Sequence, residues 1–228
     1  MTERSVRVPP WSLNGDLGGC HRCFAEALNG EALPQRFSAG LGKVCARLDR
    51  HHRDFFQGKS TSCLSADLPA GVIRSGSGVM SRPFRHEGVA LTIRGRTDAI
   101  VKLSDNRVLI VDFKSGFPNE HTAARFRPQL SAYHWALTNP VSGNTRDVAG
   151  MGILAVTPES MSPTDHGLAH LVSTTWVPVG YDHEWFINLL ETICEITADP
   201  TSAQSNIDCE WCDLRERLAR SDRHAKGI

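Results

Sequence analysis

Apolar residues recur at helical intervals in four segments of the chain. A repeat of three to four residues places the apolar side chains on one face, so each segment is predicted to be an amphipathic helix that packs on a core. Asn29-Gly30, Gly58 and Asn139-Pro140 follow the first three segments and disfavour their continuation. The predicted helices cover residues 20–28, 38–56, 129–137 and 185–196.

Runs of β-branched and other apolar residues predict strands over 89–93, 108–114, 152–156 and 171–177, the third ending at Pro158. The polar Ser104-Asp105-Asn106 predicts a turn that joins extensions of the first two strands into a hairpin. The start of the chain around Pro9-Pro10 is expected to be irregular, and residues 64–84 irregular with short strands. The pattern predicts one α/β domain, a mixed central β-sheet flanked by helices, with a core of about residues 38–196.

Composition limits the classes of protein to consider. The chain has 228 residues, 40% of them hydrophobic, which suits one mid-sized domain. Lys and Arg total 25 and so do Asp and Glu, so a nucleic-acid partner would need a local basic patch. No stretch is apolar enough to span a membrane, and residues 1–4 lack the apolar core of a signal peptide. A cytoplasmic protein without membrane contact is expected.

An acidic residue lies within the most apolar predicted strand. Asp112 follows four apolar residues, so its carboxylate is expected inside the protein, where an unpaired charge is costly. Side chains alternate along a strand, which places Asp112 and Lys114 on one face and Phe113 on the other. Folding back at the turn would bring Asp98 beside Asp112, and two carboxylates suit Mg²⁺. The alternative is a surface ion pair on an edge strand.

The order of three short motifs favours a metal site over a surface ion pair. Gly95-Arg96-Thr97-Asp98 comes first, Asp112-Phe113-Lys114 follows, and Gln129 and Tyr133 then lie one helical turn apart. The succession G-x-x-D, D-x-K and Q-x-x-x-Y closely resembles the RecB-like branch of the PD-(D/E)XK nuclease superfamily. The resemblance implies that superfamily's fold and a metal-dependent nuclease acting on DNA, with a single strand or a free end as the substrate.

The resemblance also implies a role for each of these residues. Asp98 and Asp112 would bind Mg²⁺ or Mn²⁺, with the carbonyl of Phe113 as a further ligand. Lys114 would orient or deprotonate the attacking water and stabilise developing charge. Gln129 and Tyr133 would support the lysine or contact the phosphate backbone.

One position departs from the family pattern. RecB-like enzymes often carry a metal-binding histidine on an early helix as G-x-x-x-H, whereas the matching stretch here ends in Cys45. His51 and His52 lie about two turns later and are expected on a solvated basic face. The departure leaves open a catalytically silent nucleic-acid-binding or scaffold module with the same fold.

Arginines near these motifs are the candidates for DNA contacts, because the total charge is zero. They are Arg47, Arg50, Arg53, Arg125 and Arg127.

Two C-x-x-C pairs, Cys20/Cys23 and Cys209/Cys212, lie near opposite ends of the chain. They are much farther apart than the roughly 15–20 residues of a zinc ribbon, so we expect them to meet as a staple between the ends of the domain. Spacing does not distinguish Zn²⁺ from iron, but some RecB-like nucleases hold a 4Fe-4S cluster with flanking cysteines, and the resemblance favours that cluster. Four ordinary buried cysteines, or an iron-sulfur carrier protein, are the alternatives. Cys45 and Cys194 are expected to fill the core.

Overall fold

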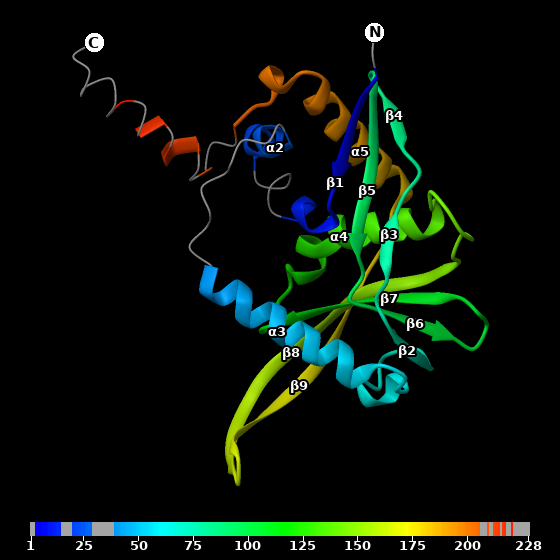
Figure 1. The fold of residues 1–228 in the computed structure, drawn as a ribbon, viewed down its shortest axis with the longest axis vertical. Coiled ribbons are helices and arrows are strands. Elements are labelled where there is room, and N and C mark those ends of the chain that lie inside the picture. The colour runs from blue at the N-terminus through cyan, green and yellow to red at the C-terminus, as the bar shows by residue number, and fades with distance from the viewer. Residues whose placement is uncertain are drawn as a thin grey trace.

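The computed structural model describes residues 3–14, 20–28, 39–205, 209, 212–214, 216, 217 and 220, with only the backbone of 39–46 and 202. Its centre is a curved five-stranded sheet in the order β2-β6-β7-β8-β9 (Figure 1). Only β7 and β8 run parallel, and the other neighbours are antiparallel. The strands are β2 (Gly71–Ser75), β6 (Ala99–Leu103), β7 (Val108–Ser115), β8 (Val148–Thr164) and β9 (Gly167–Val179).

A second, smaller sheet is built around β5 (Val89–Arg96). Its other strands are β1 (Arg4–Val8), which runs parallel to β5, and the antiparallel β3 (Gly78–Met80) and β4 (Phe84–His86). Leu91 and Ile93 of β5 are fully buried in the larger hydrophobic core, together with Ile110 of β7. One core therefore joins the two sheets.

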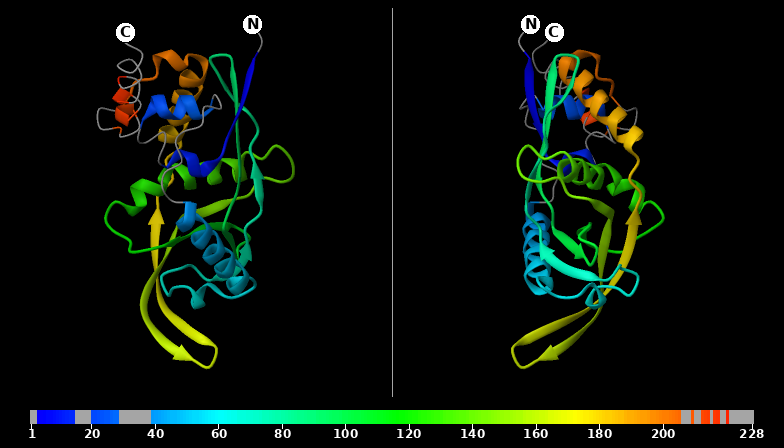
Figure 2. Two further views of the ribbon diagram at one scale, coloured as in Figure 1. Left: turned by 60° about the vertical axis from the view of Figure 1, so that its left-hand side comes forward. Right: turned by 90° about the vertical axis from the view of Figure 1, so that its right-hand side faces the viewer.

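Helices cover both faces of the five-stranded sheet (Figures 1 and 2). The larger core includes α4 (Thr122–Thr138) and α5 (His183–Ala198), with Leu130 and Leu190 buried there. On the opposite face, Phe56 of α3 (Ala39–Phe56) packs with Phe113 in a second core. The remaining helical elements are α2 (His21–Leu28), η1 (Pro10–Leu13), η2 (Thr61–Cys63) and η3 (Pro200–Ser202).

The mixed α/β architecture expected from the sequence is confirmed, but the predicted hairpin partner of β7 was wrong. β7 pairs with β6 over residues 99–103, and β5 belongs to the other sheet. The turn is where expected, with Asn106 at φ 67° and Asp105 accepting from the Arg107 amide. Both β5 and β6 have buried apolar positions, so periodicity alone does not select the partner.

Several element bounds also differ from the sequence prediction. The proline-rich start is preceded by β1, and α4 begins at Thr122 and contains Pro128. β8 continues past Pro158 through a register shift, which is where a sheet tolerates the missing N–H of proline. Strands β8 and β9 consequently form a long hairpin that extends beyond the rest of the molecule in both views of Figure 2.

Two predicted helices agree closely with the structure. α2 and α5 occupy the expected segments, and Asp182 caps α5 by accepting from the Trp185 amide. The position of Ser38, the predicted start of α3, lies outside the described residues. No helix in the described part of the chain is both long and apolar enough to cross a membrane.

Gly95 allows η1 and α4 to approach β5, which generates a testable prediction. A Cβ at this position would lie 2.6 Å from Cδ of Pro10 and 3.5 Å from Cε1 of Tyr133. We expect Gly95→Ala to lower the free energy of unfolding by about 1–3 kcal/mol, measured by urea denaturation, because the neighbours must shift. Gly180→Ala is the control, since nothing lies within 4 Å of its Cβ position. Equal stability of the two variants would contradict this account.

Candidate active site and cysteine cluster

Asp112 and Lys114 project from the same face of β7, as the alternation predicted. The Asp112 side chain is 2% exposed, and its Oδ2 lies 2.5 Å from Nζ of Lys114. Phe113 points to the other face and stacks on Phe56 with ring centroids 5.7 Å apart. The strand therefore carries a charged pair on one side and core on the other, which excludes an exposed edge-strand ion pair.

Asp98 lies immediately before β6, beside Asp112. Ala99 pairs with Val111, so Asp98 is next to Asp112 in the antiparallel register. One Asp98 oxygen, Oδ2, accepts from the Phe113 amide at 3.1 Å. The other, Oδ1, forms an ion pair with Nη1 of Arg53 at 3.2 Å. The two carboxylates meet as expected, although the strand that brings Asp98 there is not the expected one.

Gln129 and Tyr133 of α4 face these carboxylates. The Gln129 amide Nε2 donates to Oδ1 of Asp112 at 2.9 Å and lies 3.5 Å from the Tyr133 hydroxyl. The Tyr133 hydroxyl donates to the carbonyl of Arg96 at 2.7 Å, which connects α4 to β5. Both residues therefore hold Asp112 and its surroundings in place.

Asn14, at the end of η1, is a site residue that the sequence did not reveal. Its Oδ1 accepts from the Gln129 backbone amide at 3.1 Å, and its Nδ2 donates to Oε1 of Gln129. Gln129 thus keeps its Nε2 free for Asp112. No motif or periodicity singles out Asn14, because 115 residues separate it from Gln129.

The buried carboxylate is short of positive charge. Burial, and secondarily the Asp98 carboxylate, raise the pKa of Asp112 to about 7, although Lys114 acts in the opposite direction. Burial also raises the pKa of Tyr133, so its hydroxyl stays a hydrogen-bond donor. Among the described residues, the Lys114 ammonium is the group that contacts Oδ2 of Asp112. A divalent cation fits such an arrangement, because paired carboxylate oxygens are its preferred ligands and it would offset their repulsion.

Helix α3 presents three further residues to this site. Asp49, His52 and Arg53 share one face at helical spacing. Burial and the Asp98 carboxylate raise the pKa of Asp49, which places the two acids near each other. Helical spacing places Asp49 on one face of α3 with Arg53, but it does not show that this face lies against Asp98.

The solvated face expected for His51 and His52 of α3 was wrong for His52, and the candidate DNA contact Arg53 is also partly covered. His52 is half-buried with its ring 5.7 Å from that of Phe113, and burial lowers its pKa. Arg53 pairs with Asp98. His51, Arg47 and Arg50 are exposed as expected. Helical periodicity identifies a polar face but does not show which part of it another element covers.

The two candidate DNA-contacting arginines near the start of α4, Arg125 and Arg127, differ in their exposure and ion pairing. Arg125 is exposed, with its guanidinium 5.4 Å from the Phe126 ring. Arg127 forms an ion pair with Asp182 at 3.1 Å and lies over the Trp185 ring at 4.3 Å. Arg125, Arg47 and Arg50 thus present unpaired guanidinium groups among the described residues, whereas Arg127 and Arg53 are bound to carboxylates.

The four cysteines of the two C-x-x-C pairs meet in space. Their sulfur atoms all lie within 4.8 Å of one another. The shortest separations are 3.6 Å for Cys20–Cys212 and Cys23–Cys209, and 3.7 Å for Cys23–Cys212. Segments near the two ends of the sequence are thereby brought together, and four Sγ atoms form a potential metal-binding site.

The environment of these thiols suits metal binding. Burial and the neighbouring cysteines raise the pKa of Cys23, and burial raises that of Cys212 to about 11. The Cys23 and Cys212 thiols therefore resist ionisation in the absence of a cation, and a bound metal would supply the charge that stabilises thiolates. The other cysteines are separate from this cluster: Cys194 is fully buried, Cys63 is exposed, and the Cys45 side chain lies outside the described residues.

Comparisons with known proteins bear on this arrangement. Two solved structures match most of this chain at low sequence identity. The crystal structure of SSO0001 is 16% identical, with a TM-score of 0.47, and the match covers 83% of this chain and 76% of that one. An alkaline exonuclease, LHK-Exo, from Laribacter hongkongensis is 10% identical, with a TM-score of 0.43 and 94% of both chains covered. No curated protein matches the sequence.

A family profile provides the decisive comparison. The profile described as the PD-(D/E)XK nuclease superfamily matches residues 20–217, which include Asp98, Asp112, Lys114 and both cysteine pairs. Since the matched segment spans most of the 228 residues, the chain belongs to the PD-(D/E)XK nuclease superfamily.

Proposed function

We propose that this member of the superfamily is a Mg²⁺- or Mn²⁺-dependent deoxyribonuclease whose active site is built on Asp98, Asp112 and Lys114. The observation that carries the proposal is the buried Asp112 carboxylate, adjacent in register to Asp98 and 2.5 Å from the Lys114 ammonium. A protein that only binds nucleic acid gains nothing from two anions that face a phosphate unless a cation covers them. The preferred substrate is DNA with a single strand or a free end.

The side chains around Asp112 would share the work of phosphodiester hydrolysis. Asp98 and Asp112 would hold the divalent ion, with the Phe113 carbonyl as a further ligand, and that ion lowers the pKa of water and offsets negative charge at the phosphate. Lys114 would donate hydrogen bonds to the attacking water or to a phosphate oxygen and stabilise the developing charge. Gln129, held by Asn14, keeps the Asp112 carboxylate oriented.

Helix α3 would compensate for the missing histidine of the family pattern. Asp49 is the acidic residue of that helix whose pKa is raised by burial and by Asp98, and we assign to it the third ligand position. Arg53 holds Oδ1 of Asp98 and would move to a substrate phosphate when a metal ion takes the carboxylate. The same ion pair is the observation that favours the rival, a scaffold module in which Arg53 occupies the site permanently.

The first test separates catalyst from scaffold. Asp112→Asn removes a metal ligand, so we expect weaker Mn²⁺ binding by calorimetry and no cleavage of end-labelled DNA. Lys114→Ala removes a cation that repels the metal, so Mn²⁺ affinity should be equal or tighter while cleavage falls about a hundredfold. Asp147→Asn, which replaces an exposed carboxylate, should match the wild type in both measurements.

Two outcomes would contradict the proposal. Wild-type activity in both variants would place the chemistry elsewhere. A wild-type protein that binds Mn²⁺ and DNA but cleaves neither single- nor double-stranded substrate would support the scaffold function instead.

We also propose that Cys20, Cys23, Cys209 and Cys212 hold a metal centre that stabilises the fold. Two arguments favour different metal centres, a single Zn²⁺ ion and a 4Fe-4S cluster. The three shortest sulfur separations, 3.6–3.7 Å, are close to the edge of a Zn–thiolate tetrahedron, about 3.8 Å for bonds of about 2.3 Å, and all four sulfurs lie within 4.8 Å. A 4Fe-4S cluster, favoured by the resemblance to RecB-like nucleases, binds each thiolate to a different iron and requires wider spacing.

Metal analysis of anaerobically purified protein distinguishes a 4Fe-4S cluster from a single Zn²⁺ ion. Brown protein with about four irons per chain would establish the cluster, and colourless protein with one zinc would establish the single ion. In either case Cys209→Ser should lose the metal and unfold at lower urea concentration, because the centre joins the chain ends. Cys63→Ser, at an exposed cysteine outside the cluster, should keep both properties. Metal-free wild-type protein of unchanged stability would overturn the proposal.

A further inference from the structure

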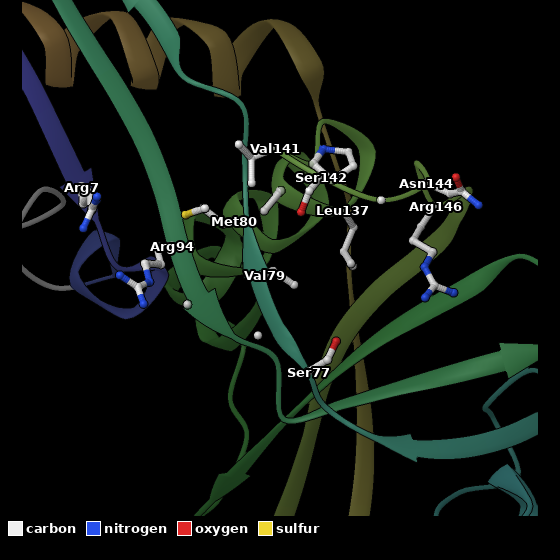
Figure 3. A pocket seen from close by; sticks show the side chains of 15 residues that line it. Arg7, Ser77, Val79, Met80, Arg94, Leu137, Val141, Ser142, Asn144 and Arg146 are labelled. Atoms are coloured by element: carbon white, nitrogen blue, oxygen red, sulfur yellow. The ribbon is translucent and has the colours of Figure 1, made fainter.

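A pocket of about 650 Å³ lies between the outer part of the smaller sheet and the end of α4, away from the carboxylates (Figure 3). Strands β1, β3 and β5 contribute Arg7, Met80 and Arg94 to its walls. Leu137 of α4 and Arg146 of the segment after α4 also line the pocket. The pocket is distinct from the candidate active site, since Asp98, Asp112 and Lys114 are not among its lining residues.

The pocket is positively charged and lacks compensating acids. None of its 15 lining residues is Asp or Glu. Arg7, Arg94 and Arg146 are exposed, and no carboxylate in the described part of the chain pairs with any of them. Arg85 in the same small sheet differs, because it pairs with Glu3 at 2.9 Å. Three unpaired guanidinium groups around one hollow favour an anionic ligand.

The arrangement of the three arginines suits a chain of phosphates. Arg7 pairs in register with Thr92 and Met80 with Arg94, so Arg7 and Arg94 lie on the same outer face of the sheet. Figure 3 shows Arg7 and Arg94 on one side of β3 and Arg146 on the other side. Guanidinium groups that are spread across a hollow contact successive phosphates, whereas a site for a single phosphate draws its donors to one point.

The pocket is also within reach of a strand bound at the active site. Gly95 lines it, and the same residue lies against Tyr133 of the candidate active site. From Gln129 to Leu137, α4 rises about 12 Å, which corresponds to a few nucleotides of a nucleic-acid strand. The exposed Met80 and Val141 add apolar surface on which a base or sugar can rest.

We propose that this pocket is a second nucleic-acid contact, in which Arg7, Arg94 and Arg146 bind the sugar-phosphate backbone of a strand that extends from the active site. The inference rests on the proposed function, because the strand bound in this pocket is taken to be the substrate of the nuclease. The pocket determines how many nucleotides of the strand the protein contacts, and it takes no part in phosphodiester hydrolysis. It thereby favours substrates several nucleotides long over short fragments.

The test measures binding in EDTA, where cleavage does not occur, by fluorescence anisotropy of labelled single-stranded DNA. The variant Arg94→Gln/Arg146→Gln is compared with Arg85→Gln/Arg107→Gln, which removes the same charge from arginines already paired with Glu3 and Asp105. For a strand of about 20 nucleotides, the pocket variant should bind about tenfold or more weakly. Its slope of log affinity against log salt should be shallower by about 1.4, or about 0.7 for each lost phosphate contact. Binding of a tetranucleotide and the kcat for cleavage with Mg²⁺ should stay at wild-type values.

The outcomes separate this inference from the proposed catalysis. Long-strand affinity equal to that of the control variant would overturn the inference even if the wild type cleaves DNA. Pyrophosphate is titrated into the same two variants as a small-anion probe. If the pocket variant loses pyrophosphate binding but keeps long-strand binding, the inference is overturned too, because the pocket would then bind a small anion. A wild type that cleaves nothing but binds the long strand through these arginines would refute the catalytic proposal and leave the inference standing.

Discussion

The burial of the Asp112 carboxylate is the constraint on which the rest of the site depends. The side chain is 2% exposed at the end of a strand whose other face is packed on Phe56. Because a lone buried charge is costly, the surroundings must supply donors and cations, and they do so with the Gln129 amide and the Lys114 ammonium. The Asp98 carboxylate is paired with Arg53, and Asp49 is a further acid close to it, so three carboxylates face two cations. The unmet demand for positive charge is the property of the fold that makes a metal site, and hence hydrolysis, chemically reasonable.

This site is assembled where two sheets meet. Gly95 in the smaller sheet permits η1 to lie close to α4, and η1 places Asn14 on Gln129. Tyr133 ties the same helix to the carbonyl of Arg96. A helix secured at both of these points holds the Gln129 amide on Asp112 without relying on a mobile loop, which is the rigidity that catalytic geometry requires.

Charge is distributed so that a neutral chain can still bind a polyanion. Formal charges sum to zero, yet Arg53 and Arg127 are neutralised by carboxylates while Arg7, Arg94 and Arg146 are not. Total charge therefore says little about the local potential of a surface. The cysteine cluster has a different effect, because it brings together segments near the two ends of the sequence, and a metal bound there would stabilise the fold.

Local periodicity was sufficient for those features that depend on neighbouring residues. Alternation along 108–115 correctly placed Asp112 and Lys114 on one face and Phe113 on the other, and helical spacing put Gln129 with Tyr133. It could not select β6 over β5 as the partner of β7, since both strands have suitable apolar positions. It also could not find Asn14, or show that Asp49, His52 and Arg53 face inward, because those roles are created by packing between distant segments. A short-range pattern fixes which side of an element is apolar, whereas the identity of the element that covers each polar side chain is decided only by the tertiary structure.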